Sequence, residues 1–236
     1  MSDSRTSPTE DSGLRAVAPA MWEVNAPLSY LGMALGHRMT VVRLPDASLW
    51  VHSPVAYSPA LAGELAMLGP IAHVVAPNCY HDTYLSGWMD AFPSVRFHAA
   101  QGFSGYRPDL KFSDFLGDTA PAAWSEVFGQ HLVAGAPRIN EVVFFHRASR
   151  SLILTDLCFN LGPEMPLLSK ILLMVNSCYC RFGPCLLMRH SIKDRAAFRA
   201  SIDRIMRWDF DRIVVGHGRN LETGAKAALH EAFRFL

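Results

Sequence analysis

The chain has 236 residues, of which 50% are hydrophobic and only 18% are charged, with 22 Lys and Arg against 21 Asp and Glu. A chain this apolar is expected to fold, and at this length it buries about 70–75% of its unfolded surface, which makes disulfides unnecessary. The formal net charge of +1 argues against a nucleic-acid partner, because nucleic-acid binders concentrate positive charge on one face. Length alone allows one large domain or two small ones.

The cysteine count and the apolar segments bear on location. Five cysteines are an odd number without the density of a disulfide scaffold, and no stretch resembling a signal peptide opens the chain, so a cytoplasmic location is expected. The longest aliphatic cluster, Ile171–Val175, is flanked by Lys170 and Asn176. It is far shorter than the ~20 residues of a membrane-spanning helix, so no membrane span is expected.

The first part of the chain begins with a polar segment. Residues 1–19 lack a periodic apolar pattern and are predicted to be a disordered tail, which leaves 20–236 as a single domain. Met39–Leu44 and Leu49–His52 predict two strands of a hairpin around a turn that contains Pro and Asp. A serine cap, a first-turn proline and a terminal glycine then predict a helix over 59–68.

An alternation of strand and helix follows. Ile71–Ala76 is a short apolar run, predicted to be a buried strand, and a Pro-Asn pair breaks it. His81 and Asp82 therefore lie just past the carboxyl end of a strand. A helix is predicted over 83–92 and another strand over 95–99.

The second half of the chain is richer in strands. Strands are predicted over 130–134, 139–146, 151–155 and 212–215. The third of them runs directly into Asp156, and the fourth leads to His217, which stands between two glycines. Glu141, within the second of them, points either toward the site or toward solvent.

Residues 162–190 form an apolar, lid-like excursion that contains Met and Cys. Five aliphatic residues fit one broad helical face: Leu167, Leu168, Ile171, Leu172 and Val175. Burial in the core is the default role for such a face. A lid over the site, a homodimer surface and a membrane-contacting patch are the alternatives.

Four residues past strand ends form the candidate site: His81, Asp82, Asp156 and His217. Imidazole nitrogens and carboxylate oxygens are zinc ligands, and the carboxyl ends of strands are where open α/β folds place their sites. Each residue also has a structural alternative. His81 or Asp82 caps the next helix, Asp156 accepts backbone N–H groups, and His217 belongs to a closely packed turn. A thiol centre at Cys79, activated by His81, is a third hypothesis.

At these positions the chain resembles the metallo-β-lactamase fold superfamily, over roughly Trp22–Leu236. Ser149–Asp156 is similar to the family's strand ending in Gly-Asp, whose aspartate can bridge two metals. Val214–Gly218 is similar to its terminal strand, which ends in a metal-binding histidine. The resemblance implies the α/β (α+β layered) class and a four-layer αββα sandwich.

The family's main signature, His-x-His-x-Asp-His, falls at Pro77–Thr83, where the chain reads Asn78-Cys79-Tyr80-His81-Asp82-Thr83. A further family histidine, expected near Gly135, is absent. The resemblance therefore implies a poorly characterised branch with an eroded motif. It also implies one divalent ion (zinc, iron or manganese) rather than two, or none.

Two functions follow from these observations. The first is a metal-dependent hydrolase of a small ester, lactone or related molecule, in which His81, Asp82, Asp156 and His217 hold the ion and Asp82 or Asp156 orients the attacking water. The second is a non-catalytic binding or scaffold protein that kept the fold after losing metal ligands. Whether the protein holds an ion separates the two.

Overall fold

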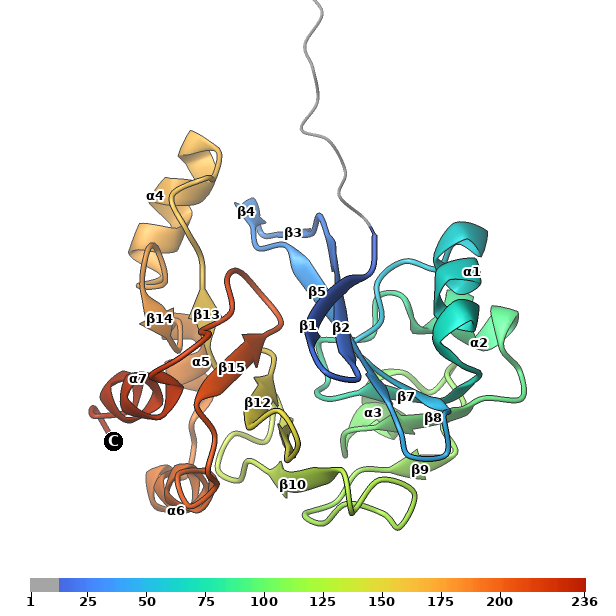
Figure 1. Ribbon diagram of the computed structural model, residues 1–236. Coiled ribbons are helices and arrows are strands. Elements are labelled where there is room, and N and C mark those ends of the chain that lie inside the picture. Colours follow the sequence, from blue (N-terminus) through green and yellow to red (C-terminus); the bar gives the residue numbers. More distant parts are fainter. Residues whose placement is uncertain (1–12) are drawn as a thin grey trace, which may run out of the picture.

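Two β-sheets pack face to face and carry helices on their outer surfaces in the part of the chain that this computed structural model describes, residues 13–236 (Figure 1). In order across the first sheet, the strands are β1 (Arg15–Ala18), β2 (Met21–Ala26), β5 (His37–Arg43), β6 (Leu49–His52), β7 (Ile71–Ala76), β8 (Arg96–Ala99) and β9 (Asp114–Phe115). In order across the second sheet, they are β10 (Phe128–Leu132), β11 (Val142–His146), β12 (Ser151–Leu154) and β15 (Arg212–Val215).

Helices and two short ribbons complete the described fold. The helices are α1 (Pro59–Leu68), α2 (Leu85–Ala91), α3 (Phe103–Tyr106), α4 (Leu167–Val175), α5 (Leu186–Ser191), α6 (Arg195–Ile205) and α7 (Ala225–Ala232). The ribbons pair β3 (Ser29–Tyr30) with β4 (Met33–Ala34), and β13 (Phe159–Asn160) with β14 (Phe182–Gly183).

Three hydrophobic clusters fill the spaces between four layers. Trp50 of β6 and Phe144 of β11 belong to the cluster between the sheets. Trp88 of α2 packs with the first sheet, whereas Phe198 of α6 and Leu229 of α7 pack with the second. The arrangement is the αββα sandwich that the resemblance to the metallo-β-lactamase superfamily implied.

Local sequence signals explain several of these elements. The Ser58 hydroxyl accepts the Leu61 N–H at 3.2 Å, with Pro59 in the first turn, so α1 begins where the sequence predicted. Gly69 ends the helix with φ +153°, and a Cβ there would lie 2.2 Å from the Ala47 carbonyl oxygen, so only glycine fits. Strands β5 and β6 form the predicted antiparallel hairpin.

The predicted disordered tail is wrong at its carboxyl end. Arg15–Ala18 forms β1, which pairs antiparallel with β2, and the Arg15 side chain reaches the buried carboxylate of Glu23. These contacts offset the conformational entropy that is lost when this segment, which lacks a periodic apolar pattern, becomes ordered. The rest of the predicted tail, residues 1–12, lies outside the described residues.

The apolar excursion folds into α4, β14 and α5 (Figure 1). Helix α4 is tied to the β3–β4 ribbon, because the Ser169 hydroxyl donates to the Gly32 carbonyl oxygen at 3.1 Å and accepts the Ala34 N–H at 3.0 Å. Within residues 13–236, no helix has both the length and the apolar character that crossing a bilayer requires.

Candidate metal centre

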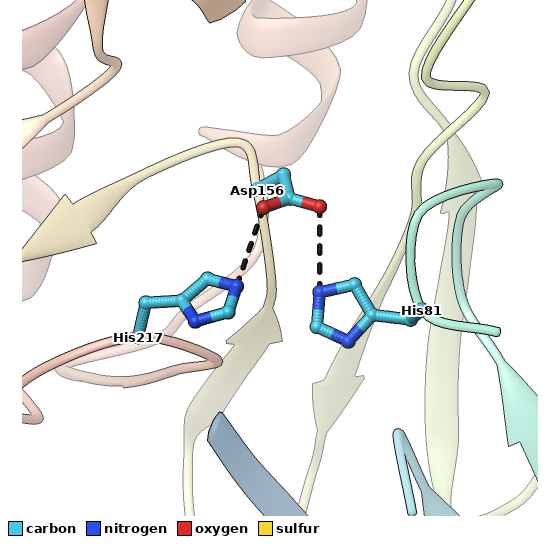
Figure 2. A group of neighbouring side chains, drawn as sticks. All are labelled: His81, Asp156 and His217. Carbon is cyan, nitrogen blue, oxygen red and sulfur yellow. Dashed lines mark ion pairs between the residues drawn. The ribbon is translucent and has the colours of Figure 1, made fainter. Parts of the chain in front are cut away.

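Three strand ends deliver the side chains of the candidate site (Figure 2). His81 follows β7, Asp156 follows β12 and His217 follows β15. His81 Nε2 lies 3.3 Å from Asp156 Oδ2, and His217 Nε2 lies 3.3 Å from Asp156 Oδ1. The three side chains therefore converge, as the strand-end argument predicted, although the sequence separates them widely.

Backbone geometry explains why glycines flank His217. Strands β12 and β15 are parallel neighbours, and a Cβ on Gly216 would lie only 3.1 Å from Thr155 Cα. Gly218 has φ +93°, and a Cβ there would lie 2.2 Å from the Asn160 carbonyl oxygen. A larger residue at either position would push the His217 loop away from Asp156.

His217 is held in one orientation. Its Nδ1 donates to the Gly36 carbonyl oxygen at 2.6 Å, so Nε2 is the nitrogen that faces Asp156. The Phe159 ring stacks on the imidazole with a centroid distance of 5.3 Å. A histidine that donates one ring N–H to a backbone carbonyl and presents the other nitrogen has the arrangement of a metal ligand.

His81 has a comparable support from Ser53. The Ser53 hydroxyl lies 2.5 Å from His81 Nδ1 and 3.2 Å from His37 Nε2, so it links two buried imidazoles. Ser53 has φ +53°, an uncommon conformation for serine. His81 Nε2 is buried and has no hydrogen-bond partner within residues 13–236, although it faces Asp156. Such an orphaned atom is costly unless something else binds it.

A second carboxylate lies behind Asp156. The Asn78 amide donates to Asp156 Oδ2 at 2.8 Å and lies 3.3 Å from Glu141 Oε2, so it separates the two acids. Glu141 Oε1 accepts the Thr155 N–H at 2.7 Å. Of the two orientations left open for Glu141, the structure therefore has the one that points toward the site.

The ionisable groups respond to this surrounding. Burial alone would raise the pKa of Asp156, but the neighbouring His81 and His217 outweigh it and hold that pKa well below its ordinary value. Burial alone would lower the pKa of His217, but Asp156 raises it overall. Burial is the larger cause, and the charge of Asp156 the smaller, that raises the pKa of Glu141 to about 7. Negative charge is thus concentrated on Asp156.

The residues present fit one divalent cation. One ligand atom each from His81, Asp156 and His217 can be chosen so that all lie within 4.8 Å of one another. The two His–Asp distances of 3.3 Å end on different oxygens of Asp156, so the carboxylate lies between the two imidazoles that would hold the ion with it. Three protein ligands leave a position open, as in catalytic zinc sites.

Asp82 does not join this group. Its carboxylate pairs with Arg107 Nη1 at 2.5 Å, and it is not part of the cluster that can hold an ion. The side chains of His81 and Asp82 diverge because the chain turns between β7 and α2. Of the four predicted ligands, the structure brings together His81, Asp156 and His217, and it places Asp82 beside Arg107 instead.

The surroundings of Cys79 do not favour the thiol-centre hypothesis. Burial is the larger cause, and the charge of Asp82 the smaller, that raises the pKa of the Cys79 thiol, which opposes thiolate formation. The Cys79 sulfur lies 3.5 Å from the Gln101 carbonyl oxygen.

A buried ion pair, which was not predicted from the sequence, holds the His217 loop. Arg38 of β5 pairs with Glu23 of β2, Nε to Oε2, at 3.1 Å. The same guanidinium donates to the carbonyl oxygens of Val215 at 2.5 Å and Gly218 at 2.8 Å. A charged pair inside an antiparallel sheet was the available signal, but the carbonyl oxygens that Arg38 contacts lie at and after the end of β15, in the other sheet.

A cavity of about 380 Å³ adjoins the centre. Gly36, His37, Gly216 and Gly218 line it on the side of the centre, and apolar residues such as Leu28 and Met165 line it elsewhere. This volume lies in the range of small-molecule sites.

Comparisons with known proteins agree with this architecture. Residues 19–179 match the model of a family described as Domain of unknown function (DUF4336), and no curated protein matches the chain. Among solved structures, the chain is similar to a metallo-β-lactamase from Pontibacter korlensis, with a TM-score of 0.62 and 13% identity over 95% of this chain and 99% of that one.

Two more solved structures lead to the same conclusion. A metallo-β-lactamase from Erythrobacter litoralis has a TM-score of 0.64 and 13% identity, over 94% of this chain and 96% of that one. FIM-1 from Pseudomonas aeruginosa, in its mono-zinc form, has a TM-score of 0.63 and 9% identity over 93% of both chains. At these identities the likeness concerns the fold, which is that of the metallo-β-lactamases.

Proposed function

The chain belongs to the family described as Domain of unknown function (DUF4336) and has the metallo-β-lactamase fold, and on that basis we propose that it is a hydrolase dependent on one divalent ion. His81, Asp156 and His217 hold the ion in this proposal. The observation that carries it is the buried His81 Nε2, which has no hydrogen-bond partner in the described residues and points at Asp156.

The ion would supply a Lewis acid and lower the pKa of a bound water to about 7. The chain's own residues prepare the site for it. Asn78 orients Asp156 through a hydrogen bond, and the Gly36 carbonyl fixes the ring of His217. With the ion bound, Asp156 would also accept a hydrogen bond from the attacking water and orient it.

The donor set restricts the identity of the ion. Two imidazoles and one carboxylate are the ligands of some catalytic zinc sites and also of non-haem iron sites. Zinc and iron are therefore the first candidates, with manganese third because it prefers oxygen ligands. We propose a small ester, lactone or related molecule as the substrate, since the adjoining cavity of about 380 Å³ accepts a molecule of that size. A cytoplasmic location stays a prediction.

The alternative is a non-catalytic binding or scaffold protein with the same fold. One observation favours the scaffold alternative: Asp156 accepts a hydrogen bond from Asn78 and faces two imidazoles without an ion. A polar network of this kind can stabilise a junction between strands without an ion.

Metal content and thermal unfolding distinguish the two. Elemental analysis of protein purified without added metal is expected to find one ion per chain, and a chelator is expected to lower the unfolding temperature because the ion binds only the folded state. Asp156→Asn and His217→Gln should each abolish the bound ion and the chelator effect.

Two exposed residues provide matched controls. Asp203→Asn on α6 and His230→Gln on α7 make the same chemical changes away from the centre and should keep wild-type metal content. The scaffold is the better account if chelator leaves the unfolding temperature of the wild-type protein unchanged and the protein takes up no ion after reconstitution with zinc, iron or manganese.

A further inference from the structure

A second hollow, separate from the His–Asp cluster, lies against the carboxyl-terminal helix. Its volume is about 230 Å³, and its lining residues are Arg181, Arg189, Glu231, Ala232, Arg234 and Phe235. Three arginines and one glutamate give the lining a formal charge of 3 − 1 = +2. A concave surface with this charge attracts anions.

Two of its cations lack an anionic partner. Arg234 pairs with Glu231 at 3.4 Å, but no ion pair within residues 13–236 involves Arg181 or Arg189. Arg189 Nε is buried and makes no hydrogen bond in the described part of the chain. Burial first, and the positive charge of Arg181 second, lower the pKa of Arg189. Both guanidinium groups line the same hollow, so their positive charges share one small space.

Phe235, the aromatic residue that lines the hollow, is held in place by two arginines. The Arg189 guanidinium carbon lies 4.3 Å from the centroid of the Phe235 ring, and Arg195 donates to the Phe235 carbonyl oxygen at 2.6 Å. Stacking on an aromatic ring restricts a guanidinium, so less conformational entropy is lost when it binds a ligand. Arg189 is thus partly organised for recognition before any ligand arrives.

We propose that this hollow is a binding site for a phosphate group, as free inorganic phosphate or as the phosphoryl group of a small molecule. Guanidinium forks match the paired oxygens of phosphate. A phosphate group carries about −1.5 to −2 charges at neutral pH, which balances the +2 of the lining. Cavities for drug-sized ligands measure about 300–1,000 Å³, so a hollow of about 230 Å³ suits a smaller anion.

The test is calorimetric titration of the full chain with inorganic phosphate, after chelator treatment so that a metal-bound phosphate does not contribute. One phosphate per chain is expected to bind, more weakly as salt is raised. Glycerol phosphate in a parallel titration distinguishes the sources: binding of both ligands indicates a phosphoryl group on a larger molecule, and binding of inorganic phosphate alone indicates the free anion.

Arg181→Gln and Arg189→Gln should each weaken binding by about tenfold or more, because each removes a charge-assisted contact. Arg199→Gln, at an exposed position of α6, is the matched control and should bind as the wild type does. If Arg189→Gln fails to fold, the Arg181→Gln variant tests the proposal by itself, because Arg181 is exposed. Absence of phosphate binding at millimolar concentration, or equal affinity in wild type and Arg181→Gln, would overturn the proposal.

Discussion

His81 and Asp82 are neighbours in the sequence, yet their side chains serve different surroundings. His81 faces Asp156 at the centre, whereas Asp82 pairs with Arg107 at the start of the loop after α3. Both types are metal ligands, so residue chemistry could not choose between them. The choice depends on the direction of each side chain at the turn after β7, and that direction follows from the packing of α2 against the sheet.

Ser53 offers a test of the support beneath His81. Ser53→Ala removes the hydroxyl that contacts His81 Nδ1 and leaves that nitrogen buried without its partner. Loss of such outer contacts typically costs 10–100-fold in metal affinity, so we expect a loss of about that size, measured by competition with a chromophoric chelator.

The control for this variant is Ser104→Ala, since Ser104 is exposed on α3 and makes no hydrogen bond to His81 within residues 13–236. It should bind metal as the wild type does. Unchanged affinity in Ser53→Ala would show that His81 needs no such support.

At the scale of elements, α4 is unusual because its apolar side chains remain uncovered. Leu167, Leu168, Ile171, Met174 and Val175 are between 51% and 74% exposed. The helix is anchored by Ser169 and by the buried Leu173, so its position is set while its outer face is free. Contiguous exposed apolar residues of this kind mark contact surfaces.

We predict that a second copy of the chain covers this face. In sedimentation velocity, the wild type should dimerise with increasing concentration, and the double variant Leu168→Asp, Ile171→Asp should stay monomeric, because the carboxylates would be desolvated in the interface. Met67→Asp, at a position that is 87% exposed on α1, should leave the dimer intact. A monomeric wild type at all concentrations would contradict the prediction and leave a lid over the site and a membrane-contacting patch as the remaining roles.

At the scale of the whole molecule, the buried pair of Arg38 and Glu23 connects the two sheets. Both residues lie in the first sheet, and Arg38 donates to backbone carbonyls at the end of β15 in the second. The Glu23 side chain is fully buried. Burial alone would raise the pKa of Glu23, but Arg38 and three hydrogen-bond donors hold it below its ordinary value of 4.5.

Arg38→Met should lower the free energy of unfolding by about 3–5 kcal/mol near neutral pH, because it leaves a buried carboxylate without its main partner. A carboxylate with a depressed pKa stabilises the fold fully above its unfolded value, and this contribution is lost as pH falls through the folded value. The difference between wild type and Arg38→Met should therefore shrink below about pH 4.5. Denaturant unfolding at several pH values measures it.

The exposed pair of Arg96 and Asp114 provides the comparison, since their side chains are 61% and 54% exposed. Arg96→Met should cost only about 0–1 kcal/mol. If Arg38→Met and Arg96→Met lost the same free energy of unfolding, burial would not increase the contribution of the Arg38–Glu23 pair to stability.

The sequence by itself determined the strands β5 to β8, β10 to β12 and β15, the helices α1 and α2, and the residues that follow the strand ends. Apolar runs, the serine and proline at the start of α1 and the glycines around His217 are local signals, and they depend only on neighbouring residues. The positions of His81, Asp156 and His217 past their strands were for this reason predictable, and so was their convergence at one edge.

Only the tertiary structure decided which groups support and complete the centre. Ser53 reaches His81 from the neighbouring strand end of the same sheet, whereas the Gly36 carbonyl and the Arg38–Glu23 pair reach the His217 loop across the contact between sheets. The cationic side chains Arg181 and Arg189 line one hollow with Phe235 only in the folded chain. Secondary structure repeats over a few residues, whereas these contacts join positions far apart in the chain. Their geometry is set by how the layers pack, and no local pattern encodes that packing.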